Sequence, residues 1–358
     1  MAYEVDFLPV GDGERSGDAI CLRFGDLNPG RDQQVVMVID GGYLKSGEEM
    51  VTHIKKYYRT EYVDIVVSTH PDADHATGLT VVLEQMQEGQ LWMHRPWNHT
   101  EDIAKMFQDS RVTDKSVRES LRRSLETARN LEEIANRQNI PIVEPFAGLT
   151  DRTGHILVVG PSEKFYESLL SQFRGTPEAI PTPGLLARAI QPVTELAKTI
   201  AESWNIETLT DEGQTSAEND SSTLILVWAG DQDYLLFTGD SGIPALTGAT
   251  EYLMSRGFDF KKLRFVQVPH HGSHHNVGPA ILDRLIGTKL PAGAHLRTAF
   301  VSVAKDAGKH PSRKVVNAFK RRGATVHATQ GTNKLHHRNS SRGWTASTPL
   351  PFYKRVEE

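Results

Sequence analysis

Short apolar runs recur along the chain, each bounded by glycine, proline or charged residues. The run at residues 63–69 is β-branched and nearly uninterrupted, and runs at residues 234–237 and 265–268 resemble it. Runs of about four to eight apolar residues between turn residues are typical of buried strands. We expect further strands at residues 5–10, 19–24, 35–39, 156–159, 222–228, 298–303 and 325–329.

Stretches with helical character separate these runs. We expect helices at residues 48–58, 112–138, 165–173, 185–204, 244–256 and 312–322. Alternation of strands and helices predicts a mixed α/β protein. We expect one domain over residues 1–333, with a mainly helical insertion at about residues 87–218. Residues 334–358 are expected to form a loosely ordered C-terminal tail.

The overall composition narrows the class of protein only a little. The formal charge is −5, which neither demands nor excludes a nucleic-acid partner. The lone cysteine, Cys21, permits neither an internal disulfide nor a cysteine-based zinc site. No apolar window approaches the roughly 20 residues of a membrane helix, and the N-terminus does not resemble a secretory signal. We therefore expect a cytoplasmic protein with no membrane partner.

The segment at residues 70–75 carries the clearest chemical signal. It places His70, Asp72, Asp74 and His75 directly after the predicted strand at residues 63–69. A strand-to-helix loop on a rigid scaffold can direct several side chains at one point. Imidazole and carboxylate together suit a first-row divalent metal. A solvated turn that happens to be rich in His and Asp is the alternative.

Two later strands also end in residues that can bind a metal. One predicted strand is followed by Asp240, and another by His270 and His271. Open sheets place their sites beyond the carboxyl ends of strands. Three such strand ends in one chain favour a metal site over a solvated turn.

These motifs resemble the metallo-β-lactamase superfamily. The resemblance rests on residues 70–75, 238–240 and 270–273, and within the superfamily it is greatest to the soluble domain of the DNA-uptake protein ComEC. Residues 7–17, 40–42, 219–222 and 310–311 extend it over the whole chain except the insertion. The fold that it implies is a four-layer αββα sandwich with a binuclear metal site at one edge.

The resemblance also implies a set of ligands. His70 and Asp72 would bind a first metal, and Asp74 and His75 a second. Asp240 would bridge the two ions. A histidine from the pair His270 and His271 would complete the second site, and we favour His271.

The chain departs from the commonest pattern of the superfamily at two places. Position 72 is Asp where many members have His, and the third-motif histidine is absent. Asn219 and Asp220 stand there instead. Either Asp220 or Asn219 takes its place as a ligand, or the first metal is under-coordinated. Carboxylates favour Mn²⁺ or Mg²⁺, whereas the affinity order favours Zn²⁺. We expect two divalent ions, Zn²⁺ or Mn²⁺.

Such a pair of ions implies hydrolysis. Two divalent ions can activate water at neutral pH and neutralise charge on a phosphoryl or acyl oxygen. We expect Asp74, His270 and His310 to be the catalytic residues. His310 is our first candidate to protonate the leaving oxygen, with His270 or a nearby lysine as the other choices. The alternative for His310 is a plain turn before the helix.

The substrate is predicted from a basic segment. Residues 305–338 contain nine Lys and Arg residues, namely Lys305, Lys309, Arg313, Lys314, Lys320, Arg321, Arg322, Lys334 and Arg338. If they border the site, they favour a polyanion, so a phosphodiesterase or nuclease is the leading hypothesis. A hydrolase of small esters, lactones or thioesters is one alternative. A metal-stabilised, non-enzymatic partner of an operon-encoded protein is the other.

Overall fold

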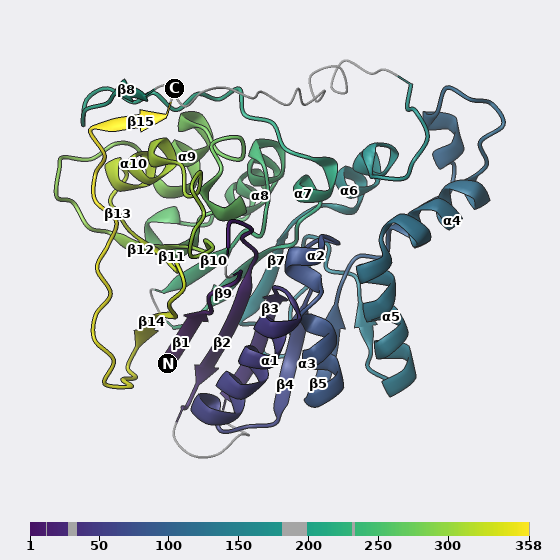
Figure 1. Cartoon of the computed structure of the whole chain (residues 1–358), viewed down its shortest axis with the longest axis horizontal. Helices are drawn as coiled ribbons and strands as arrows, with labels where there is room; N and C mark the ends of the chain where they lie inside the picture. Colours follow the sequence, from purple (N-terminus) through teal and green to yellow (C-terminus); the bar gives the residue numbers. More distant parts are fainter. Residues whose placement is uncertain (12, 28–33, 181–198, 231–232, 358) are drawn as a thin grey trace.

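Two β-sheets that pack face to face form the centre of the molecule (Figure 1). The computed structural model describes residues 1–11, 13–27, 34–180, 199–230 and 233–357. The first sheet has the order β14-β1-β2-β3-β4-β5-β6 and the second β13-β12-β11-β10-β9-β7. The first consists of β1 (Ala2–Phe7), β2 (Ala19–Gly25), β3 (Gln34–Gly41), β4 (Tyr62–Val67), β5 (Gln87–Trp92), β6 (Ile142–Val143) and β14 (Lys334–Arg338). The second consists of β7 (Ile156–Gly160), β9 (Leu224–Trp228), β10 (Tyr234–Phe237), β11 (Leu263–Gln267), β12 (Arg297–Val301) and β13 (Ala324–Ala328).

Helices cover the outer face of each sheet. The helices are α1 (Leu44–His53), α2 (Ala73–Ala76), α3 (Leu79–Gln85), α4 (Asp114–Ser124), α5 (Glu126–Gln138), α6 (Glu163–Leu169), α7 (Ala217–Asp220), α8 (Ile243–Ser255), α9 (Pro279–Ile286) and α10 (Arg313–Arg321). Apolar residues of α1, α3, α4 and α5 pack on the first sheet, and those of α8, α9 and α10 pack on the second. The four-layer αββα sandwich expected from the sequence is therefore confirmed.

Strand β3 shows why the apolar runs are nearly uninterrupted. Val36 and Val38 face the helices, whereas Met37 and Ile39 face the other sheet. Successive side chains of a strand point to opposite faces, and here both faces are buried. Four phenylalanines, Phe7, Phe237, Phe265 and Phe300, meet between the sheets. Cys21 is buried in β2 and unpaired, as expected of a core residue.

The middle of the chain contributes more to the sheets than the sequence suggests. Residues 87–218, expected as a mainly helical insertion, contain β5, β6 and β7, which extend both sheets. The charged stretch at 112–138 is helical as expected, and is divided into α4 and α5. Of the helix expected at 185–204, residues 185–198 lie outside the described residues, and Thr199–Ala201 form strand β8.

The C-terminal segment is also more regular than expected. The predicted loose order after Asn333 is wrong for two parts of the C-terminal segment. Strand β14 pairs antiparallel with β1, and β15 (Arg355–Glu357) pairs with β8. In the described part of the chain, no helix has the length and apolar character needed to span a bilayer.

The direction of the strands determines where the candidate functional residues lie. Strands β3, β4, β5 and β6 run parallel in the first sheet, and β10, β11, β12 and β13 run parallel in the second. Within each set the carboxyl ends therefore lie along one edge. Loops that leave these ends carry the candidate functional residues.

Candidate metal centre

The metal-capable side chains leave the carboxyl ends of strands in both sheets. The loop after β4 carries His70 and Asp72, and α2 then carries Asp74 and His75. Asp240 follows β10, and His270 and His271 follow β11. The candidate centre is therefore shared between the two sheets, at the carboxyl ends of their strands.

Asp240 lies in the middle of the histidines. Its Oδ2 atom is 3.3 Å from His75 Nε2, 3.8 Å from His70 Nε2 and 3.7 Å from His270 Nε2. Two ligands of one tetrahedral ion, each bonded at about 2.0–2.1 Å, are about 3.4 Å apart. The observed spacing is therefore close to what a shared cation requires.

Asp74 forms a second group with histidines from both sheets. Its Oδ2 atom is 3.9 Å from His75 Nε2 and 3.8 Å from His271 Nε2. Asp74, His75 and His271 together can offer three ligand atoms within 4.8 Å of one another. His271 is buried, whereas the side chain of His270 is 30% exposed. The structure thus places His271, rather than His270, in the group with Asp74.

Several buried atoms of the centre have no hydrogen-bond partner among the described residues. They are His70 Nε2, His75 Nε2, His271 Nε2 and Asp240 Oδ1. An unsatisfied buried polar atom costs on the order of 1–3 kcal/mol, so four in one place need an explanation. A divalent cation would satisfy all four, and imidazole with carboxylate is a donor set that suits Zn²⁺ or Mn²⁺. The residues present therefore fit a metal.

Hydrogen bonds on the far side of each ring fix its orientation. Asp40 Oδ2 accepts from His75 Nδ1 at 2.8 Å and from the Thr69 hydroxyl at 2.7 Å. Because Thr69 Oγ1 donates to Asp40, it accepts from His70 Nδ1 at 3.0 Å. His271 Nδ1 donates to a backbone carbonyl, that of Ser302, at 3.0 Å. All three rings then present the Nε2 lone pair to the centre, as metal-binding histidines require.

Two buried aspartates support the centre without having been proposed as site residues. Asp40 orients both His70 and His75 and ends strand β3, so the strand-end rule could have found it. Asp18 immediately precedes β2, and its carboxylate oxygens are 3.8 Å from His75 Nδ1 and 3.9 Å from His271 Nδ1. No sequence signal marks Asp18, because only the fold brings the start of β2 to this edge.

Charges at the centre shift in the directions that its carboxylates impose. Burial alone would lower the pKa of His75, but the carboxylates of Asp240 and Asp40 raise it well above its ordinary value. The pKa of Asp18 is raised to about 6, because burial and the charges of Asp240 and Asp40 outweigh the lowering by His75 and His271. The centre therefore holds excess negative charge, which a cation would offset.

The remaining predicted ligands lie at the rim or outside the group. Asp72 Oδ2 is 3.7 Å from His70 Nε2, and its other oxygen pairs with Arg174. Asp220 Oδ1 accepts from the backbone N–H of Gly242 at 3.1 Å. Asp220 is absent from the ligand groups found among the described residues. Asp72 thus has one carboxylate oxygen paired with Arg174 and the other directed at His70. Asp220 accepts a backbone hydrogen bond.

Asparagines, rather than a third-motif histidine, contact His270. Asn276 Nδ2 donates to the backbone carbonyl of Asp240 at 2.7 Å, which points Asn276 Oδ1 at His270 Nδ1, 2.9 Å away. Asn219 Nδ2 lies 3.1 Å from the same nitrogen. Both His270 and His271 have positive φ angles, 45° and 53°. Strained backbone conformations of this kind cluster at functional sites, where the surrounding structure holds them in place.

His310 lies beside the histidine pair. Pro311, its neighbour, packs against Gly272, and His310 Nδ1 is buried with no hydrogen-bond partner among the described residues. Burial lowers the pKa of His310 to about 4, and the charges of His271 and His270 lower it further. His310 is therefore uncharged at neutral pH in this structure.

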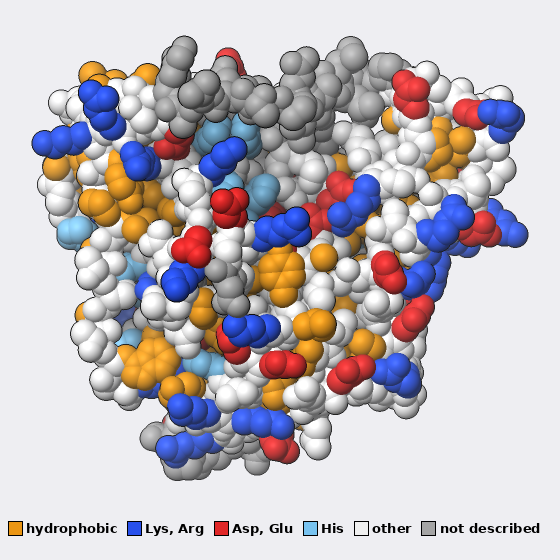
Figure 2. Space-filling model, in the orientation of Figure 1, with side chains coloured by type: hydrophobic (Ala, Val, Ile, Leu, Met, Phe, Trp, Pro, Cys, Tyr) orange, Lys and Arg blue, Asp and Glu red, His pale blue; other side chains and the backbone are white. Residues whose placement is uncertain are grey.

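Three of the nine basic residues at 305–338 pair with acidic residues of the fold. On the face shown in Figure 2, Lys and Arg side chains are interspersed with Asp and Glu side chains. Arg321 and Arg322 are fully buried and pair with Glu202, Glu207 and Asp283. Arg338 pairs with Asp233. These three side chains serve the fold, so the segment offers a polyanion fewer free charges than its sequence suggests.

Comparisons with known proteins add little to this geometry. No family model and no curated protein matches the sequence. A solved structure of a candidate metallo-beta-lactamase from Thermotoga maritima matches with 12% identity and a TM-score of 0.34, covering 72% of this chain and 86% of that one. A mutant of the CmlA beta-hydroxylase matches with 12% identity and a TM-score of 0.41, covering 94% of this chain and 54% of that one. Likeness at this level says nothing about function.

Proposed function

We propose that this chain is a metal-dependent hydrolase of the metallo-β-lactamase superfamily, most similar to the ComEC-like branch. It binds two divalent ions, Zn²⁺ or Mn²⁺, and cleaves phosphodiester bonds of nucleic acid or nucleotides. One observation supports this more than any other. Four buried acceptor atoms, from His70, His75, His271 and Asp240, converge with no hydrogen bond to satisfy them.

The arrangement of ligands favours two ions rather than one. Asp74, His75 and His271 form one group, and His70 with Asp72 forms the other. Asp240 lies between them, within 3.8 Å of both His70 and His75. When bound, two divalent ions supply a hydroxide nucleophile at neutral pH and neutralise charge on the attacked phosphoryl group.

Residues at the rim would position the substrate. Arg174, whose side chain is 47% exposed, pairs with Asp72 at the mouth of the centre and can turn to a phosphate oxygen. His310 is uncharged until a phosphoryl anion beside it raises its pKa, and it then carries a proton that the leaving oxygen can accept. His270 lies at the rim with its Nε2 atom facing Asp240 and contacts the same substrate group.

A hydrolysis assay tests the proposal. Protein loaded with Zn²⁺ or Mn²⁺ is mixed with labelled DNA, RNA and bis(p-nitrophenyl) phosphate, beside a panel of esters and lactones. We expect metal-dependent cleavage of at least one phosphodiester, abolished in Asp74→Ala. Ester turnover without phosphodiester turnover would move the chain to the other hydrolase class. Absence of all turnover from protein shown to hold metal would favour the non-enzymatic partner.

A further inference from the structure

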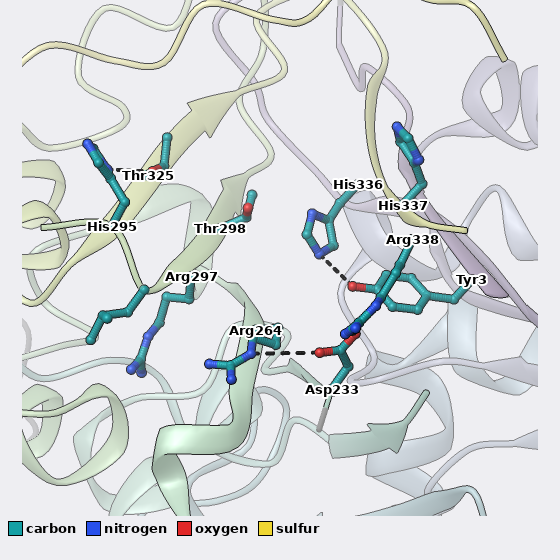
Figure 3. Close-up of a pocket in the computed structure, with 11 residues that line it drawn as sticks. Tyr3, Asp233, Arg264, His295, Arg297, Thr298, Thr325, His336, His337 and Arg338 are labelled. Carbon is teal, nitrogen blue, oxygen red and sulfur yellow. Dashed lines mark hydrogen bonds and ion pairs between the residues drawn. The ribbon is translucent and has the colours of Figure 1, made fainter. Parts of the chain in front are cut away.

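A second pocket lies at the opposite edge of the second sheet from the metal centre. It has a volume of about 360 Å³ and lies where strands β11, β12 and β13 begin, beside β14 (Figure 3). Arg264 stands at the start of β11, whereas His270 and His271 follow its end. The two sites therefore occupy opposite ends of the same parallel strands.

Arg297 is the unusual residue of this pocket. It is 7% exposed, and its Nε and Nη1 atoms are buried without a hydrogen-bond acceptor in the described part of the chain. A buried guanidinium without a paired anion is strongly unfavourable, because desolvation is not offset by any partner. Arg321 and Arg322, also buried, each contact carboxylates. Arg297 therefore lacks what the other buried arginines have.

The pocket has more positive than negative charge. Three arginines line it, Arg264, Arg297 and Arg338, against one carboxylate, Asp233. Asp233 pairs with Arg338 and lies 3.7 Å from Arg264 Nε (Figure 3). Asp233 Oδ1 forms no hydrogen bond among the described residues. Burial, and then repulsion by Arg264, lower the pKa of Arg297 to about 10.

We propose that this pocket binds a phosphate group through Arg297 and Arg264. Guanidinium N–H groups form charge-assisted hydrogen bonds to phosphate oxygens, and the Nε and Nη1 donors of Arg297 have no acceptor among the described residues. The hydroxyls of Thr298 and Thr325 and the ring of His295 line the same pocket and add donors. The site is separate from the metal centre and does not depend on the hydrolase proposal.

The phosphate can be free or can belong to a small molecule. A volume of about 360 Å³ exceeds that of a phosphate ion and lies in the range of pockets for small organic ligands. Exposed Leu296 and the ring of His336 border it and could contact an organic group. Inorganic phosphate and adenosine monophosphate therefore serve as two probes of the same chemistry.

Thermal unfolding and calorimetry test the pocket. Both probes are titrated into the full chain carrying Asp240→Asn, so that phosphate binding at the metal centre does not contribute. Chloride at equal ionic strength is the reference. We expect a saturable rise in Tm with phosphate, and weakening of binding by at least about tenfold in Arg297→Met, since a charge-assisted hydrogen bond contributes roughly 1.5–3 kcal/mol. Tighter binding of the monophosphate would identify an esterified phosphate as the ligand.

Two further variants keep the test decisive. Arg264→Gln alters a partly exposed residue and should weaken binding without unfolding the protein. Arg284→Met, on α9 and more than half exposed, is the matched control and should leave binding unchanged. A rise in Tm that chloride reproduces, or one that survives both Arg297→Met and Arg264→Gln, would overturn the proposal.

Discussion

The two ends of the parallel strands in the second sheet differ in the kind of polar atom that they leave unsatisfied. Beyond the carboxyl ends, His271 Nε2 and Asp240 Oδ1 lack partners among the described residues and are placed as acceptors. At the amino ends, Arg297 has two donors without a partner, and the Asp233 Oδ1 acceptor beside it lies 3.7 Å from Arg264 Nε. Unsatisfied acceptors call for a cation, and unsatisfied donors call for an anion. The sign of a missing ligand can thus be inferred from which atoms lack partners.

The largest expected effect comes from replacing Asp240, the carboxylate in the middle of the candidate metal centre. Asp240→Asn should lower phosphodiester turnover by at least about 10³-fold and release metal, since one electrostatic stabiliser is worth about 10²–10³ and Asp240 would also bridge both ions of the proposed centre. Asp220→Asn is the matched control, because its Oδ1 acceptor for Gly242 is retained. Activity and metal content are measured together. Loss of metal in Asp220→Asn, with none in Asp240→Asn, would reverse our assignment.

The next largest effect is expected on stability, where the buried arginines Arg322 and Arg297 should differ because only Arg322 is paired with acids in the described part of the chain. Arg322 Nε donates to Asp283 at 2.8 Å and Nη1 to Glu207 at 2.8 Å, whereas Arg297 lacks such partners. Arg322→Met should lower the free energy of unfolding by about 1.5–3 kcal/mol, because it removes the hydrogen bonds of Arg322 to Glu207 and Asp283. Arg297→Met in phosphate-free buffer should leave it unchanged or raise it. Urea unfolding measures both, and equal losses would remove the distinction.

A smaller effect is expected from the residue that orients the histidines. Asp40→Asn keeps the contact with the Thr69 N–H but loses the acceptor for His75 Nδ1. Metal affinity should fall by about 10–100-fold, the usual effect of such supporting residues. Zinc competition titration measures it, with Asp64→Asn, which accepts from Val36 away from the centre, as the control. Unchanged affinity would show that Asp40 is only structural.

The smallest effect concerns a buried histidine outside the ligand group. Burial lowers the pKa of His94 to about 3 from an ordinary value near 6.5. Between these values the unfolded chain binds a proton that the folded chain does not. The free energy of unfolding therefore falls as pH drops below about 6.5, by up to about 1.4 kcal/mol per pH unit from this group.

Unfolding at pH 6.5 and 5 measures this dependence with and without metal. His94→Gln should flatten it, and a change at exposed His275 should not. His94 lies beside His70 but is absent from the ligand groups of the described residues, so metal should leave its contribution unchanged. A contribution that vanishes on adding metal would make His94 part of the centre.

The sequence predicts the parts of this fold that depend on local pattern. Apolar runs located the strands, because both faces of each sheet are buried, and strand ends located His70, Asp240 and His271. Asp18 was missed because it precedes a strand rather than follows one, and only antiparallel pairing of β2 brings it close to the histidines of the centre. Whether Arg321 and Arg322 turn inward depends on Glu202 and Glu207, which lie more than 100 residues away in the sequence. A charge pattern alone cannot show this.

Strand β14 escaped prediction for a related reason. Its residues, Lys334–Arg338, are polar and lack an apolar alternation, so their strand conformation depends on the free edge of β1. Tertiary context of this kind overrides local propensity.

That pairing also has a consequence for synthesis on the ribosome. Strand β1 emerges first, yet one of its two neighbours, β14, emerges more than 300 residues later. Arg342, which contacts Glu4 and Asp6 in β1, follows it. Until then β1 has an open edge, and Glu4 and Asp6 have only Arg23 and His53 as ionic partners among the described residues. An open strand edge invites strand addition by other chains, so we expect truncation before residue 334 to promote aggregation.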